Sequence, residues 1–370
     1  MAHISRRSLL AGSALVAASS QAQTSSIGVG MIGVGNRGGH LLKQVLEVPG
    51  TSVRAICDLK PDRVDRAASM AAKDKPAVVR DWKQLLERKD VDAVHIATPC
   101  DLHPEMAIAA LKAGKHVYLE KPAGIEPKSI AELVKVAKAS NKVLIIGQQM
   151  RSSKRNQAII ASLRDGLVGE ILMVKAQRHS GDDLAHDSSS ADWFFDAKRS
   201  GDVLVEMSVH NLDVCNWIIN EYPERAAGFG GTQLWKNDPP GRTNMDGYTL
   251  SYDYPGGVKL SYTQVFFHWS GLPGGGQVWN VYGSKGALDF QSAMFYPRTK
   301  GESPKKVYES DERENIDLDH VKAFYEAIRT GKPVPTGIKE GASGALTAIM
   351  GREAIYQKRV TTWKEMGVTL

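Results

Sequence analysis

The chain has 370 residues, of which 47 are basic and 41 acidic, and its formal net charge at neutral pH is +6. The basic excess is small and scattered, with no basic stripe interleaved with aromatic residues, so the composition argues against nucleic-acid binding. At ~150 residues per domain, this length predicts two domains, each able to form a core without metal or disulfide cross-links.

The first 23 residues resemble an export signal rather than part of a fold. Arg6 and Arg7 precede an apolar run, Leu9 to Ala18, that is shorter than the ~20 residues needed to span a bilayer. Small residues around Ala22 fit a cleavage site, and the paired arginines are typical of the twin-arginine route, which carries folded proteins. We therefore expect residues 1–23 to be removed and the mature protein to be periplasmic or secreted, without a membrane contact.

Residues 27–150 alternate short apolar runs with helical patterns. The apolar runs are IGVGMIGV, SVRAIC, AVHIATP, HVYLE and VLIIG. Between them apolar residues recur at helical spacing, as at Met106, Ala109, Ala110 and Ala113. This βαβ series predicts a parallel sheet covered by helices on both faces, which is a Rossmann-type domain.

The pattern changes after residue 150. Tyr248, Leu250 and Tyr252 alternate with polar residues, and a second alternating run follows the turn at 255–257, which predicts an antiparallel hairpin. We expect residues 151–335 to form an α+β domain with a large, mainly antiparallel, open sheet, whose free face would support a homo-oligomer. Residues 336–370 are expected to form a C-terminal helix and tail that pack back on the Rossmann domain.

The three cysteines, Cys57, Cys100 and Cys215, form no CxxC motif and cannot all pair. The strands that end near Cys57 and Cys100 are expected on either side of the first strand, about 10 Å apart. That separation is too large for a disulfide. We expect all three to be small buried hydrophobic residues.

Gly33, Gly35 and Gly38 form the pattern GxGxxG between the first strand and a helix, and Asp58 ends the next strand. In this context the pattern predicts a dinucleotide site. The first glycine makes the tight turn, the second lets the pyrophosphate approach the backbone, and the third lets helix and strand pack closely. Asp58 is expected to bind the adenosine ribose and repel a 2′-phosphate, which favours NAD over NADP, although basic residues nearby weaken that preference.

Two further stretches resemble the Gfo/Idh/MocA oxidoreductases. Residues 97–124, ATPCDLHPEMAIAALKAGKHVYLEKPAG, contain Thr-Pro after a strand, a helix ending in AGKHV, and a strand that runs into Glu-Lys-Pro. Residues 201–217, GDVLVEMSVHNLDVCNW, resemble the family's substrate motif, in which an acid precedes a histidine by four residues. With the glycine loop, the resemblance covers residues 27–217 and implies an oxidoreductase acting on sugars or polyols.

The glycine motif and the resemblance together predict a site for tightly bound NAD. It lies on the glycine loop and at the ends of the second, third and fourth apolar runs. The expected cofactor-binding residues are Gly33, Gly35, Asn36, Arg37, Gly38, Asp58, Thr98, Pro99, His103, Glu120, Lys121 and Pro122.

The resemblance also implies the catalytic residues. Lys121 matches the family lysine that helps to activate the substrate hydroxyl, and His210 matches the general acid/base. The usual aspartate before this histidine is replaced by Glu206, whose longer side chain shifts the carboxylate. On one continuous helix Glu206, His210 and Asp213 would share a side, so that both carboxylates could orient the imidazole.

The polar stretch 178–193 contains groups that can bind sugar hydroxyls, but such a composition is also typical of an exposed loop. His179, Asp182, Asp183 and His186 lack the spacing of a standard metal site, so no metal is expected. Trp193 fits either stacking on a sugar ring or packing in the core.

Three functions fit these residues. The first is an exported oxidoreductase that moves hydride between a sugar hydroxyl carbon and tightly bound NAD. The second is a redox-neutral glycoside hydrolase, which oxidises its substrate, eliminates the glycosidic group, adds water and returns the hydride. The third is a sugar-binding protein without activity, against which Lys121 and His210 argue.

Overall fold

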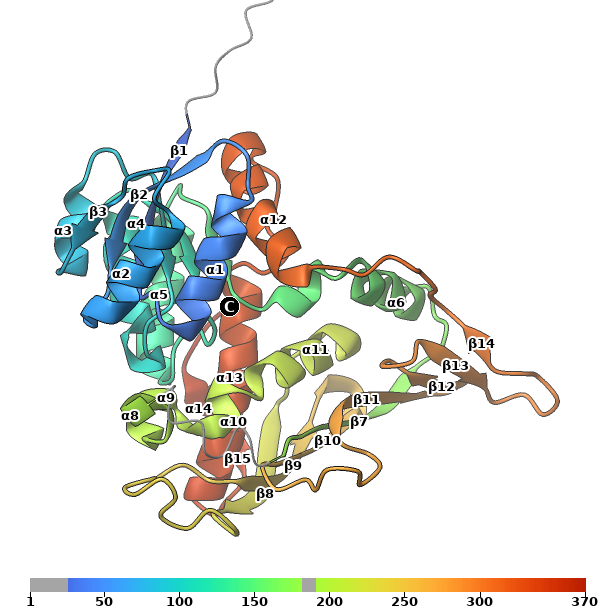
Figure 1. Cartoon of the computed structure of the whole chain (residues 1–370). Helices are drawn as coiled ribbons and strands as arrows, with labels where there is room; N and C mark the ends of the chain where they lie inside the picture. The colour runs from blue at the N-terminus through green and yellow to red at the C-terminus, as the bar shows by residue number, and fades with distance from the viewer. Residues whose placement is uncertain (1–25, 182–190) are drawn as a thin grey trace, which may run out of the picture.

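The computed structural model describes residues 26–181 and 191–370, so the expected export segment lies outside the described residues. A six-stranded parallel sheet forms the centre of the first domain, at the top of Figure 1. Its strand order is β3-β2-β1-β4-β5-β6, which confirms the predicted Rossmann-type domain. The strands are β1 (Ile27–Ile32), β2 (Thr51–Cys57), β3 (Ala77–Val79), β4 (Ala93–Ile96), β5 (His116–Leu119) and β6 (Leu144–Ile146).

The predicted helices lie between these strands. They are α1 (Asn36–Leu46), α2 (Pro61–Met70), α3 (Trp82–Glu87), α4 (His103–Lys112) and α5 (Pro127–Ala139). The strands β1, β4 and β6 are buried along their whole length, as expected for a sheet covered on both faces. Strand β3 has no counterpart among the apolar runs, because it is a three-residue edge strand that is only partly buried.

A nine-stranded mixed sheet forms the second domain, at the bottom of Figure 1. Its order is β14-β13-β12-β11-β7-β10-β9-β8-β15, and β7 and β10 are its parallel pair. The predicted hairpin is confirmed, since β9 and β10 pair with Tyr252 opposite Leu260. The strands are β7 (Ile171–His179), β8 (Arg225–Gly231), β9 (Gly247–Asp253), β10 (Lys259–Val265), β11 (Gly276–Gly283), β12 (Gly286–Asp289), β13 (Met294–Pro297), β14 (Lys305–Lys306) and β15 (Thr361–Thr362).

Helices cover one face of this sheet. Tyr252, Leu260 and Tyr262 point to that face and are almost fully buried. The helices after residue 150 are α6 (Lys154–Arg164), α8 (Ala191–Phe194), α9 (Ala197–Ser200), α10 (Asp202–Glu206), α11 (Val209–Ile219), α12 (Ile316–Thr330), α13 (Ile338–Tyr356) and α14 (Trp363–Met366).

Helix α13 joins the two domains. It packs on α5 and β6 of the first domain and on α10, α11 and β8 of the second (Figure 1). Small residues make this possible: a Cβ at Gly341 would lie 2.3 Å from Ile146, and one at Gly351 would lie 2.1 Å from the Tyr252 hydroxyl. The C-terminal helix therefore contacts the Rossmann domain and the second domain alike.

Helix α12 covers the first domain, although the sequence placed residues 316–330 in the second. Val321, Phe324 and Tyr325 share a hydrophobic cluster with Val29 and Tyr118. Aromatic rings and apolar side chains of α12 thus complete the core around the parallel sheet. The domain boundary expected at residue 335 does not match this packing.

The three cysteines are buried and unpaired, as expected. Among the described residues, no helix is long and apolar enough to cross a membrane. The charged stretch 299–315 is mostly exposed and holds the short edge strand β14.

Two buried histidines lie where α12 meets the parallel sheet. The His95 ring lies 2.8 Å from the Tyr325 hydroxyl, and His320 contacts the Ser152 hydroxyl and the Ile146 carbonyl at 2.7 and 2.9 Å. Burial lowers the pKa of His95 to about 3 and that of His320 to about 4. Both rings are therefore neutral in the folded protein at every pH above these values.

We predict that acid weakens the fold at this contact. In the unfolded chain both histidines take up protons below about pH 6.5, while the folded protein resists protonation, so stability falls as the pH drops from 6.5 toward 4. Between pH 7 and 5 each histidine should reduce the free energy of unfolding by about 2 kcal/mol. Denaturant titrations at both pH values would measure this. His95→Gln should remove about one proton from the uptake on unfolding, and an unchanged pH slope would contradict the assignment.

Candidate nucleotide pocket and catalytic centre

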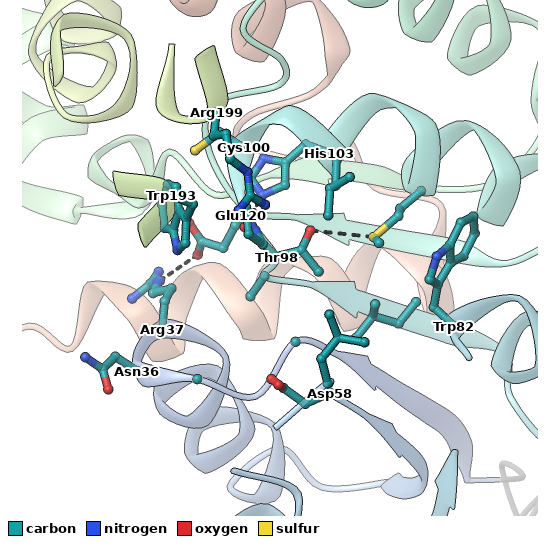
Figure 2. A pocket seen from close by; sticks show the side chains of 18 of the residues that line it. Asn36, Arg37, Asp58, Trp82, Thr98, Cys100, His103, Glu120, Trp193 and Arg199 are labelled. Atoms are coloured by element: carbon teal, nitrogen blue, oxygen red, sulfur yellow. Dashed lines mark hydrogen bonds and ion pairs between the residues drawn. The ribbon is translucent and has the colours of Figure 1, made fainter. Parts of the chain in front are cut away.

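A cavity of about 920 Å³ opens at the carboxyl ends of the parallel strands, between the two domains. Such an edge is where open α/β sheets bind their ligands. Figure 2 shows Asp58 and Trp82 at one end of the cavity and Trp193 and Arg199 at the other. The cavity has the volume of a site for a ligand as large as a dinucleotide.

The glycine loop has the geometry that a dinucleotide needs. Gly33 has a φ of +81°, and a Cβ there would lie 2.5 Å from the Ala97 carbonyl oxygen. A Cβ at Gly38 would lie 1.9 Å from the Gly33 carbonyl oxygen. Gly35 is the N-cap of α1, and the N-terminus of a helix is a general binding site for phosphate. Larger residues at Gly33 or Gly38 would therefore clash with the backbone, and the loop as it stands fits NAD.

Asp58 lies at the end of β2, with its carboxylate fixed by the backbone. It accepts hydrogen bonds from the N–H groups of Val34 and Lys60, at 2.8 and 3.0 Å. The basic residues Lys60 and Arg63 also line the cavity. Negative and positive groups therefore both line this end of the cavity, and the expected preference for NAD over NADP stays a prediction.

Arg37 and Glu120 connect the glycine loop to the end of β5. Arg37 Nε donates to Glu120 Oε1 at 2.6 Å (Figure 2). Arg37 Nη2 lies 2.8 Å from Asp317 Oδ1 on α12. Asn36 lines the cavity beside them. The carboxylate of Glu120 therefore binds the glycine loop through its ion pair with Arg37.

His103 fixes the two loops that follow β4 and β5. Its Nδ1 lies 2.8 Å from the Pro122 carbonyl oxygen and its Nε2 lies 2.9 Å from the Thr98 carbonyl oxygen. The ring is buried, and both nitrogens contact backbone. Thr98, Pro99 and His103 all line the cavity. His103 is thus placed to position these loops rather than to offer a free polar atom to a ligand.

Lys121 and Glu206 meet at the end of the cavity, and both line it. Lys121 Nζ donates to Glu206 Oε1 and, at 2.9 Å, to the Glu206 carbonyl oxygen. Lys121 follows β5 of the first domain and Glu206 ends α10 of the second. Two predicted site residues from different domains therefore form one ion pair.

His210 lies behind this pair, outside the set of residues that line the cavity. Its Nδ1 is buried and has no hydrogen-bond partner among the described residues. Burial, with the nearby cations Lys121 and Arg178, holds the pKa of His210 well below its usual value. The imidazole is therefore neutral at pH 7 and able to accept a proton.

The expected single helix carrying Glu206, His210 and Asp213 is wrong. Helix α10 ends at Glu206 and α11 begins at Val209, so a break separates the glutamate from the histidine. Asp213 is buried, and its carboxylate accepts hydrogen bonds from Arg151 at 2.8, 2.9 and 3.1 Å. Asp213 thus pairs with Arg151 and makes no hydrogen bond to the imidazole.

Phe194 and Arg199 line the cavity without any signal in the sequence. Trp193 and Phe194 of α8, and Arg199 of α9, cover it from the second domain. Arg199 Nε lies 3.3 Å from Asp101 Oδ2, which fastens α9 to the loop after β4. Trp193 lines the cavity, and its stacking on a sugar ring stays a prediction.

The described residues contain no cluster of three or more histidine, cysteine or acidic side chains that could hold a metal ion. His179, one of the four residues considered for such a site, lies 2.9 Å from the Thr263 hydroxyl. Asp182, Asp183 and His186 lie outside the described residues.

Two family descriptions match the chain in succession. The oxidoreductase family with the NAD-binding Rossmann fold, GFO/IDH/MocA, matches residues 27–148. The GFO/IDH/MocA C-terminal domain matches residues 156–289.

Individual proteins are similar over part or all of the chain. A glycosyl hydrolase family 109 protein of Saccharopolyspora erythraea is 37% identical over 40% of this chain and 34% of its own length. An alpha-N-acetylgalactosaminidase of Shewanella oneidensis is 30% identical over 47% of this chain and 41% of its own length. The chain thus spans less than half of these relatives. The crystal structure of scyllo-inositol dehydrogenase from Lactobacillus casei with bound NAD(H) and scyllo-inositol has a TM-score of 0.74, with 19% identity over 91% of this chain and 99% of that one.

We predict that Gly33→Ala damages both the fold and the nucleotide site. An L-residue in this left-handed conformation costs ~1–2 kcal/mol before any clash with the Ala97 carbonyl is counted. The unfolding free energy should fall by at least ~2 kcal/mol, because overpacking adds to that strain, and NAD affinity should fall as well. Denaturant titration and calorimetry with NAD would measure the two effects.

Gly39→Ala is the matched control. Gly39 is also on the first turns of α1, but a Cβ there would lie at an ordinary 3.6 Å from the Val34 carbonyl oxygen. Alanine favours a helix interior over glycine by ~0.5–1 kcal/mol, so this variant should be at least as stable as the wild type. Equal behaviour of the two variants would contradict the role assigned to Gly33.

Proposed function

Because the chain belongs to the GFO/IDH/MocA oxidoreductases, we propose that it moves hydride between a hydroxyl-bearing carbon of a sugar or glycoside and NAD bound in this cavity. The observation that carries the proposal is the position of Lys121 and Glu206, which meet where the cavity runs from the glycine loop to the second domain. When bound, NAD supplies the hydride acceptor and donor.

The remaining chemistry belongs to this chain. Removing hydride from carbon requires that a proton leave the attached hydroxyl, and a base within hydrogen-bond reach accepts it. Lys121 is the group placed to bind that hydroxyl, since its ammonium faces the cavity and is oriented by two oxygens of Glu206. Glu206 replaces the shorter aspartate of the family pattern and can span the distance to this lysine.

His210 is the proposed general base. Its neutral state follows from burial and from the cations around it, which oppose a further positive charge. Among the residues that the structure describes, its buried Nδ1 has no hydrogen-bond partner. Since Asp213 is paired with Arg151, its carboxylate is not placed to orient the imidazole.

A redox-neutral glycosidase is the second candidate, and the relatives described above favour it. Such an enzyme starts with the same hydride removal, which acidifies the neighbouring C–H bond and allows the glycosidic group to be eliminated. Water then adds and the hydride returns to the sugar. The proposed export by the twin-arginine route also favours a closed cycle, because the periplasm offers no expected nicotinamide pool to renew a cofactor that leaves the enzyme.

One experiment separates the two candidates. The protein is purified without added cofactor, its bound nicotinamide is quantified, and it is incubated with 4-nitrophenyl α-N-acetylgalactosaminide. Nitrophenol release without net NADH formation, from protein that retains roughly stoichiometric NAD, is expected for the glycosidase. NADH that accumulates with added NAD and a free sugar, without nitrophenol release, indicates the dehydrogenase. Absence of both, across a panel of glycosides and sugars, would contradict the proposal.

We predict that Lys121→Met and His210→Ala each lower turnover by ~10² or more, as expected for loss of a positioned proton-transfer group. NAD affinity should change little, because the glycine loop is untouched. Lys121→Met leaves the nearly buried Glu206 carboxylate unpaired and should also lower the free energy of unfolding, by ~3–5 kcal/mol. Lys112→Met, at an exposed position of α4, is the control and should keep normal turnover. Near-normal turnover in either site variant, with folding confirmed, would remove that residue from the mechanism.

A further inference from the structure

A row of polar side chains crosses three neighbouring strands of the second sheet. Arg178 of β7 is paired in register with Gln264 of β10 and with Gln277 of β11. Along β7, Val174 and Ala176 point to the same face as Arg178 and are buried under the helices. The inner face of the sheet thus changes from apolar to polar at Arg178, near the carboxyl end of β7.

This row lies beside the proposed catalytic centre. Arg178 Nη1 donates to the Met207 carbonyl oxygen at 3.4 Å, in the break between α10 and α11. Met207 lines the cavity next to Glu206. Arg178 is also one of the cations that hold the pKa of His210 low. The polar row therefore meets the lining of the cavity at Met207, although its own three residues are not among those that line it.

Arg178 is partly buried and has no carboxylate partner among the described residues. Arg37, Arg151 and Arg352 each form ion pairs. Arg178 Nε is buried and donates no hydrogen bond, and Nη2 makes none in the described part of the chain. The Nε–Nη2 edge of a guanidinium is the edge that binds a carboxylate with two parallel hydrogen bonds.

The side-chain amide of Gln264, on the neighbouring strand β10, also has an unpaired donor among the described residues. Gln264 is fully buried, and its Oε1 accepts hydrogen bonds from the Ser208 and Tyr262 hydroxyls. These contacts fix the amide, yet Gln264 Nε2 has no acceptor among the described residues. Buried donors in folded proteins have partners with few exceptions, and an exception calls for an acceptor that binds there. At adjacent register positions, Arg178 and Gln264 offer unpaired donors and one uncompensated positive charge.

We propose that Arg178 is a specificity-determining residue that binds a carboxylate of the substrate, and that the substrate is a uronic acid or its glycoside. The proposal rests on the proposed function, since it places this acid beside the hydroxyl that Lys121 binds. A planar carboxylate with one charge matches one guanidinium edge and one amide, whereas a doubly charged phosphate calls for more cations than this row provides.

Binding to the NAD-loaded protein tests this directly. Calorimetry compares methyl glucuronide with methyl glucoside, and methyl galacturonide with methyl galactoside, so that each pair differs only in the carboxylate. We expect at least one uronide to bind tenfold or more tightly than its neutral partner. Arg178→Gln should reduce that preference to threefold or less while NAD affinity stays the same, and Arg178→Lys should keep an intermediate preference.

Arg164→Gln is the matched control, because Arg164 also donates to helix carbonyls, at Trp217 and Ile218, but lies on α6. It should keep the full preference. If Arg178→Gln fails to bind NAD, the test rests on Arg178→Lys. A preference for uronides that is undiminished in Arg178→Lys would contradict the bidentate contact.

Three results would overturn the proposal: neutral glycosides binding as tightly as uronides, a preference that survives in Arg178→Gln, or hexose 6-phosphates binding more tightly than uronides. Neutral glycosides that bind and react while uronides do not would overturn this inference alone. NAD-loaded protein that binds no sugar of either kind would contradict the proposed function as well.

Discussion

The ion pair between Lys121 and Glu206 brings together one candidate site residue from each domain. Each residue alone would be a nearly buried charge, and removal of one partner from a buried pair typically costs ~3–5 kcal/mol. The pair can form only if the loop after β5 and the end of α10 meet at one point. The positions of α8 and α9 over the cavity, and of His210 and Arg178 behind it, depend on that meeting.

The sequence predicted those parts of the fold whose signal is local. Each long strand of the first sheet is a continuous apolar run, and the glycine loop follows one of them directly, so strand, turn and helix could be inferred together. The three-residue strand β3 offers too short a pattern. Helix α12 has an ordinary amphipathic pattern, but nothing in that pattern says which sheet Phe324 will cover.

The residues of the candidate site likewise divide into those with a local signal in the sequence and those without one. The glycines, Asp58 and Lys121 are found by their places at the ends of apolar runs, because parallel strands all end at one edge of their sheet. Asp213 was misassigned because a helical spacing cannot reveal a competing partner, here Arg151, that lies 62 positions earlier in the chain. Arg178 carries no motif at all. Its environment appears only when β10 and β11 lie on either side of β7.

The packing of α12 and α13 has a consequence for how the protein is made. The core of the first domain needs Phe324 and Tyr325 of α12, and β6 is covered by α13. When the parallel strands have been synthesised, α12 and α13, which help to bury them, have therefore not yet left the ribosome. The core around the nucleotide pocket is therefore complete only near the end of synthesis, and part of the apolar sheet surface stays uncovered until the C-terminal helices emerge.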